Sequence, residues 1–183
     1  MVGDAEVVRA TEAHRDLALR RLPLHSQDGE DEMTHETRLL SITVQRPVAE
    51  VRAYLADPLN FAEWASGLAG GLEPISEEGL QESDPTLWSA QSAQGEVTVR
   101  FSGTNDFGVA DHWVFLPDGT TVYVPLRAVA NGDGTEVLLT LYRQPSMDDA
   151  KFRGDGEWVR RDLDKLKAVL EGKSPRSGVD RTA

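Results

Sequence analysis

Residues 109–143 have the sequence VADHWVFLPDGTTVYVPLRAVANGDGTEVLLTLYR, which predicts three antiparallel strands joined by two tight turns. The strands are rich in Val, Thr and aromatic residues, which suit a half-buried sheet, and we expect them at residues 109–116, 120–130 and 135–143. Asn and Gly tolerate the positive φ of tight hairpins, and the two turns contain them: Pro117-Asp118-Gly119 and Asn131-Gly132-Asp133-Gly134. The stretch therefore predicts part of an antiparallel meander.

Further strands are expected on the N-terminal side of this meander. Residues 87–93 and 96–102 form a second hairpin through Gln94-Gly95, and residues 38–46 alternate as a strand does. A weaker strand is expected between Leu72 and Gln81, where Pro74 fits an edge position because it has no N–H to donate. The sequence thus predicts an antiparallel sheet of about six to seven strands.

Three helices are expected around the sheet. Two short ones follow the first strand, since Pro47 suits the start of one and Asp57-Pro58 supplies an N-cap and first residue for the other. The longest helix begins at Ser146 or Asp148 and ends near Gly172. Its apolar residues share one face at helical spacing, namely Phe152, Val159, Leu163, Leu166 and Leu170. A sheet and a long amphipathic helix must cover each other, so the expected fold class is α+β.

The composition fits one domain and narrows its partners. A length of 183 residues suits a single domain, and no stretch approaches the roughly 20 apolar residues of a membrane span, so we expect no membrane insertion and a cytoplasmic location. The net charge of -12 repels phosphate backbones, which argues against a nucleic acid partner. Without Cys, and without histidines at metal-ligand spacing, the sequence predicts no metal and no cofactor. We expect a monomer or a homodimer.

The two ends of the chain differ from its middle. We expect residues 1–35 to form a flexible acidic tail, because they hold the run Asp28-Gly29-Glu30-Asp31-Glu32 and only a weak helical pattern. Met33 stands directly before the first strand, which suggests that residues 1–32 are an upstream extension of a domain that starts there. Residues 36–172 form the expected ligand-binding domain, and residues 173–183 a disordered C-terminal tail.

Four stretches carry a resemblance to a known family. They are Ile42 to Pro58 leading to Trp64, then Asp111-His112-Trp113-Val114, then Pro125 to Gly134, and finally Asp162 to Lys167. In this order they resemble the helix-grip proteins, variously called SRPBCC, START-like or polyketide cyclase/dehydrase-like. The resemblance implies a curved antiparallel sheet around a long C-terminal helix, with two short helices after the first strand. It also implies an internal cavity for a molecule of lipid, polyketide or isoprenoid type.

Aromatic side chains are the first candidates to line such a cavity, because flat rings give large apolar contact at low entropy cost. Trp and Tyr each add one polar contact. The expected ligand-binding residues are Phe61, Trp64, Trp88, Trp113, Tyr123, Tyr142 and Trp158, together with Arg100. For each aromatic residue, packing in the core is the alternative interpretation.

Catalytic residues, if the chain has any, are expected among His112, Arg127, Tyr123 and Tyr142. Strand alternation places Asp111 and His112 on opposite faces, so only one of them can line the cavity. Arg127 lies in an apolar strand, where it either faces water or meets an acid, such as a ligand carboxylate or Asp111.

The sequence leaves three functions open. The first is a binding or carrier protein that holds an apolar or amphipathic small molecule in the cavity. The second is a polyketide cyclase or dehydratase that uses the same cavity, with His112 able to exchange protons near neutral pH. The third is a non-catalytic interaction module that makes contact through the acidic tail.

Overall fold

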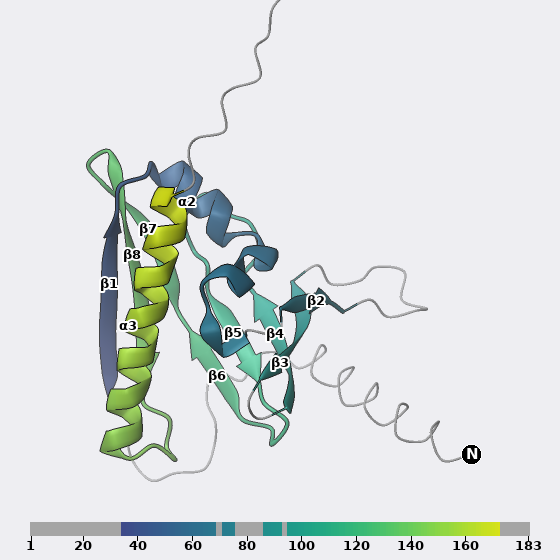
Figure 1. Cartoon of the computed structure of the whole chain (residues 1–183). Coiled ribbons are helices and arrows are strands. Elements are labelled where there is room, and N and C mark those ends of the chain that lie inside the picture. The colour runs from purple at the N-terminus through teal and green to yellow at the C-terminus, as the bar shows by residue number, and fades with distance from the viewer. Residues whose placement is uncertain (1–33, 69–70, 76–85, 93–94, 173–183) are drawn as a thin grey trace, which may run out of the picture. The chain divides into compact units, whose positions relative to one another are not determined.

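The computed structural model describes residues 34–68, 71–75, 86–92 and 95–172 of the chain (Figure 1). The chain separates into two compact units, residues 1–35 and residues 36–183. Apart from Thr34 and His35, the first unit lies outside the described residues, so the fold is that of the second unit. The tails expected at residues 1–35 and 173–183 fall almost entirely outside the described residues and stay predictions.

The second unit has the α+β order that the sequence predicts, with short helices after the first strand and a long helix at the end. Its elements are β1 (Thr37–Val44), α2 (Val48–Leu55), η1 (Pro58–Glu63), η2 (Ser66–Leu68), β2 (Leu72–Pro74), β3 (Leu87–Ser92), β4 (Gly95–Phe101), β5 (His112–Phe115), β6 (Thr121–Val124), β7 (Leu126–Asn131), β8 (Gly134–Tyr142) and α3 (Asp149–Gly172). Both η1 and η2 are 3-10 helices. The part of the expected weak strand between residues 76 and 81 lies outside the described residues.

All strand pairs are antiparallel and form two ladders, in the orders β1-β8-β7 and β2-β3-β4-β5-β6. Backbone hydrogen bonds join the ladders across their neighbouring edges. Ala110 N–H donates to the carbonyl of Leu126 at 2.8 Å, and Ala128 N–H donates to the carbonyl of Gly108 at 2.9 Å. The two ladders therefore make one curved antiparallel surface (Figure 1).

Pro125 divides a segment that the sequence predicted as one strand, residues 120–130. The structure has β6 before this proline and β7 after it. Proline has no N–H, so it cannot continue a hydrogen-bonded ladder, and the chain changes partner here. β6 pairs with β5, whereas β7 pairs with β8.

The long helix α3 covers the ladder that contains β1 and β8 (Figure 1). Leu163 and Leu166 are fully buried beneath it, as the helical spacing predicted. On its flank, Arg160 and Lys167 donate to the carbonyls of Ser41 and Thr43 at 2.7 Å and 2.8 Å. Both carbonyls belong to β1, an edge strand of its ladder. Capping them protects an exposed edge from pairing with another chain.

The short elements α2, η1 and η2 cover the rest of the inner face, since α2 packs on β7, η1 on β2 and η2 on β3. The predicted Asp-Pro start is confirmed: Pro58 begins η1 and the Asp57 side chain accepts a hydrogen bond from Leu59 N–H at 3.0 Å. Neither α2 nor α3 is both long and apolar enough to cross a membrane.

Candidate functional site

Four rings meet on the face of the sheet that is turned toward the helices. The ring of Phe61 lies at their centre, 4.8 Å from the ring of Trp64 and 5.1 Å from that of His112. Phe101 completes the group at 4.9 Å from Phe61. Phe61 lies in η1, and Trp64 is the residue directly after the end of η1. Phe101 is the last residue of β4 and lies opposite His112, the first residue of β5. All four residues are buried, and we call them the inner aromatic cluster.

His112 presents a neutral ring to this cluster. Its Nδ1 lies 3.4 Å from the carbonyl oxygen of Ala110. A carbonyl can only accept, so Nδ1 carries the proton and Nε2 presents a lone pair. Within the described part of the chain, His112 makes no other hydrogen bond. Burial lowers the pKa of His112 to about 4, and the hydrogen bond to Ala110 opposes that shift only in part. At neutral pH the ring is therefore uncharged.

Trp64 supplies a second polar atom that its surroundings do not satisfy. The side chain is 3% exposed, and its Nε1–H is buried with no hydrogen-bond partner among the described residues. Leaving a buried donor unpaired costs roughly 1–3 kcal/mol, so such groups are rare in native proteins and call for an explanation. Trp64 and His112 both contact the ring of Phe61, so this unpaired donor belongs to the same cluster as the imidazole.

A small pocket of about 10 Å³ lies between α2, residues 105–110 and β7. Its lining residues are Arg52, Leu55, Ala56, Asn105, Gly108, Val109, Ala110 and Ala128. Ala110 precedes His112 by two residues on the extended chain, so the two side chains point to the same face. Drug-sized sites have roughly 300–1,000 Å³. The pocket therefore has room for about one water molecule and is far smaller than such a site.

The opposite face of the sheet holds a buried carboxylate, Asp111, which is 4% exposed. It accepts hydrogen bonds from the Tyr123 hydroxyl at 2.6 Å and from Leu126 N–H at 2.9 Å, and it forms an ion pair with Arg127. Leu126 directly follows Pro125, where the ladder changes partner. Asp111 therefore supplies an acceptor at the junction of the two ladders. This contact decides between the alternatives for Arg127, whose partner in the structure is Asp111.

Several residues expected to line a cavity lie on this outer face instead. Trp113 stacks on Tyr123 with 5.0 Å between ring centroids, and Tyr123 stacks on Tyr142 at 6.2 Å. Arg100 lies directly opposite Trp113 in the ladder. Neighbouring strand residues point to opposite faces, so the inward position of His112 turns Trp113 outward. Trp113, Tyr123, Tyr142 and Arg100 therefore cannot line a cavity between the sheet and α3, contrary to the expectation that they would.

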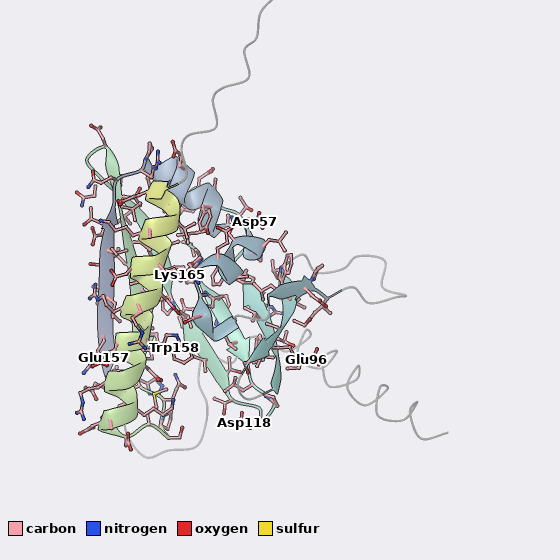
Figure 2. The ribbon with its side chains drawn as sticks, viewed as in Figure 1. Asp57, Glu96, Asp118, Glu157, Trp158 and Lys165 are labelled. Atoms are coloured by element: carbon pink, nitrogen blue, oxygen red, sulfur yellow. The ribbon has the colours of Figure 1, made fainter. Side chains whose placement is uncertain are left out.

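Two more expected residues lie at different places on the inner side. Trp88 pairs with Val99 across β3 and β4 and is partly buried against the inner core. Trp158 is 41% exposed and extends from α3, where its Nε1–H donates to the hydroxyl oxygen of Ser66 (Figure 2). The same hydroxyl donates to Asp162 at 2.6 Å, and Ser66 N–H donates to the other carboxylate oxygen at 3.2 Å. These three hydrogen bonds, the Ser66 latch, hold η2 against α3.

Two parts of the site were missed by the sequence analysis. Phe101 was not among the expected residues, although the pattern Val97, Val99, Phe101 shows the inner face of β4 directly. The pocket residues carry no such signal, because they come from α2, the segment 105–110 and β7, which only the folded chain brings together.

No family model and no curated protein matches the chain, but solved structures do. A START superfamily protein from Mycobacterium smegmatis has a TM-score of 0.56 and 12% identity, covering 74% of this chain and 97% of its own. DynU16, a putative protein in the dynemicin biosynthetic locus, has a TM-score of 0.53 and 14% identity, covering 75% of this chain and 48% of its own. Ara h 8.0201 has a TM-score of 0.53 and 9% identity, covering 75% of this chain and 99% of its own. At these identities the likeness concerns the fold, and the described residues between 36 and 172 have the helix-grip fold.

Proposed function

We propose that the domain binds a small apolar or amphipathic molecule at the inner aromatic cluster, as a binding or carrier protein. One observation carries this proposal: Trp64 Nε1–H is buried with no partner among the described residues, in the same ring cluster as the buried His112. An unpaired buried donor costs roughly 1–3 kcal/mol, which a bound molecule would offset by accepting its hydrogen bond. The rings around these atoms provide the apolar contact that most ligand sites share.

The surroundings of the cluster are consistent with this role. The lining of the small pocket includes Ala110, which precedes His112 by two residues in the chain. One structural neighbour, DynU16, is named for a biosynthetic locus, so biosynthetic intermediates belong among the ligands to test, beside lipids and isoprenoids. We propose that the protein acts in the cytoplasm as a monomer or homodimer, with no nucleic acid partner.

The alternative of a cyclase or dehydratase has less support. Of its four candidate residues, His112 alone lies on the inner face; Arg127 and Tyr123 contact Asp111 on the other side, and Tyr142 stacks on Tyr123. A pKa of about 4 also makes His112 a weak base at neutral pH, far from the value that favours general base catalysis. The third alternative, an interaction module, depends on an acidic tail that lies outside the described residues.

The full chain tests the proposal directly. Native mass spectrometry and solvent extraction of the purified protein look for a retained ligand, and thermal shift assays cover a panel of lipids, isoprenoids and aromatic polyketides. A ligand at about 100 times its Kd should stabilise the domain by about 2.7 kcal/mol. A protein that retains nothing and responds to no member of the panel contradicts the proposal.

Two matched variants locate the site. Trp64→Phe removes the inner indole N–H and should weaken the response to ligand. Trp113→Phe makes the same chemical change on the outer face, where the ring stacks on Tyr123, and should leave the response unchanged. If Trp113→Phe weakens binding and Trp64→Phe does not, the ligand site is on the wrong face for this proposal.

A further inference from the structure

The inner aromatic cluster is closed in this structure. All four of its residues are buried. The pocket between α2, residues 105–110 and β7 has about 10 Å³, which is room for about one water molecule. A guest that accepts a hydrogen bond from Trp64 Nε1–H therefore reaches this atom only if part of the domain moves.

Building on the proposed function, we infer that residues 64–68 form a lid over the inner aromatic cluster, which the Ser66 latch closes and whose opening admits the ligand. The lid consists of Trp64, Ala65 and the 3-10 helix η2 (Ser66–Leu68). Because Trp64 belongs to both the lid and the cluster, opening the lid exposes the unpaired indole N–H to solvent. The inference adds a gating step that the proposed function does not contain.

The lid begins where the contacts that fix η1 end. Tyr54 of α2 binds η1 twice, since its hydroxyl donates to Glu63 at 3.0 Å and its carbonyl accepts from the Asn60 side chain at 2.9 Å. Glu63 is the last residue of η1. The residues after Glu63 can therefore move while η1 stays in contact with α2.

Side-chain hydrogen bonds close the lid on α3. The hydroxyl and the N–H of Ser66 both donate to the carboxylate of Asp162, and Trp158 Nε1–H donates to the same hydroxyl (Figure 2). Ser66 and Trp158 are both exposed, so water can replace these bonds when the latch opens. One such hydrogen bond changes an opening equilibrium by about fivefold.

Opening the lid disturbs less of the domain than moving a strand or α3. The strands beside the cluster are joined by backbone ladders, and α3 is anchored by the buried Leu163 and Leu166. In contrast, η2 is one 3-10 turn of three residues, and such turns have poor hydrogen-bond geometry. Segments of this kind open locally at a lower free energy than global unfolding. Opening also separates the ring of Trp64 from that of Phe61, so the open state is the minor one.

Exchange of the Trp64 indole proton with deuterated solvent tests the inference without any ligand. The full chain is isotope-labelled, its four indole signals are assigned with Trp→Phe variants, and exchange is followed by NMR at pH 7 and several urea concentrations. The reference is the amide of Val137, a fully buried residue in the middle of β8. We expect the protection factor of Trp64 Nε1–H to be at least about tenfold lower than that of Val137, with a weaker dependence on urea.

Variants of the latch assign this opening to the lid. Ser66→Ala removes two hydrogen bonds and Trp158→Phe removes one, so exchange of Trp64 Nε1–H should become about 25-fold and about fivefold faster. Two matched controls leave the latch intact. Ser92→Ala removes a hydroxyl hydrogen bond between β3 and β4, and Trp113→Phe changes an indole on the outer face. Neither control should alter the exchange of Trp64 Nε1–H.

Two results would overturn the inference. If Trp64 Nε1–H has the protection factor and urea dependence of Val137, the lid does not open separately from global unfolding. If Ser66→Ala affects its exchange no more than Ser92→Ala does, the latch does not close the lid.

Because no ligand takes part, these results are independent of the proposed function. Separate opening in a chain that binds no ligand supports the lid and removes the function. Ligand binding by a chain without separate opening removes the lid and leaves the function in place.

Discussion

Lowering the pH from 7 to 5 should destabilise the domain by about 2 kcal/mol through His112 alone. Burial lowers the pKa of this residue from 6.5 to about 4 in the folded chain. Between these two values the unfolded chain binds a proton that the folded chain does not. The contribution of His112 to stability is therefore fully present above pH 6.5, and it is lost progressively as the pH falls toward 4.

The magnitude follows from the two pKa values. One pKa unit corresponds to about 1.4 kcal/mol. At pH 5 the solution is about 1.5 pH units below the pKa of His112 in the unfolded chain, so protonation stabilises the unfolded chain by about 2 kcal/mol. At pH 4 this loss of stability approaches 3 kcal/mol. The side chains packed against the imidazole are Phe61 of η1, Phe101 of β4 and, across the ladder, Val124 of β6. None of these side chains carries a negative charge that could stabilise the protonated imidazole.

Urea denaturation at several pH values measures this effect in wild type and in His112→Phe. The variant keeps a flat ring but cannot titrate, so carboxylates contribute equally to both proteins and cancel in the difference. We expect the stability difference between the two proteins to change by about 2 kcal/mol between pH 7 and pH 5. A difference that stays constant within about 0.5 kcal/mol would show that His112 is not buried as a neutral ring.

Four further substitutions test the packing of the domain. Asp111→Asn should cost roughly 2 kcal/mol in urea denaturation, because Arg127 loses its charged partner; a cost below about 0.5 kcal/mol refutes the structural role. Ser66→Ala removes the two hydroxyl hydrogen bonds of the Ser66 latch and should speed amide hydrogen exchange in residues 58–68, with unchanged exchange as the contrary result. Gly154→Ala should stabilise α3 by about 1 kcal/mol, because nothing lies within 4 Å of the added Cβ. Gly156→Ala should gain less, since its Cβ would meet an arginine side chain at 3.0 Å, and equal thermal shifts would contradict this.

Local patterns predicted most of the fold. Alternation and turn residues gave β4 and β8 closely, and helical spacing gave α3 with its buried Leu163 and Leu166. The predicted strand bounds are wrong where one segment can pair with a strand of either ladder. Residues 109–111 were expected in β5, but Val109 bridges to Arg127 and Ala110 donates to Leu126 instead. Which of two neighbours a strand end pairs with depends on the curvature of the whole sheet, and no local pattern encodes it.

The candidate site was predicted in part. Alternation correctly separated Asp111 from His112, but it could not say which of them faces the helices. That choice depends on the register that pairs His112 with Phe101, whose inward direction follows from the apolar positions of β4. A list of aromatic residues that ignores this register mixes inner rings with outer ones such as Trp113. The unpaired Trp64 Nε1–H has no sequence signature, because only the folded structure shows that no acceptor lies near it.

The cost of that unpaired group leads to a last prediction. A satisfied core Trp loses both packing and a hydrogen bond when it is replaced by Phe, and large core truncations cost several kcal/mol. At Trp64 the lost packing is offset by removal of an unpaired donor worth roughly 1–3 kcal/mol. Without ligand, the free energy of unfolding of Trp64→Phe should therefore lie within about 1 kcal/mol of that of wild type. A loss of more than about 3 kcal/mol in urea denaturation would mean that the indole N–H is already satisfied in the folded chain, and the main support for a ligand at the inner aromatic cluster would be lost.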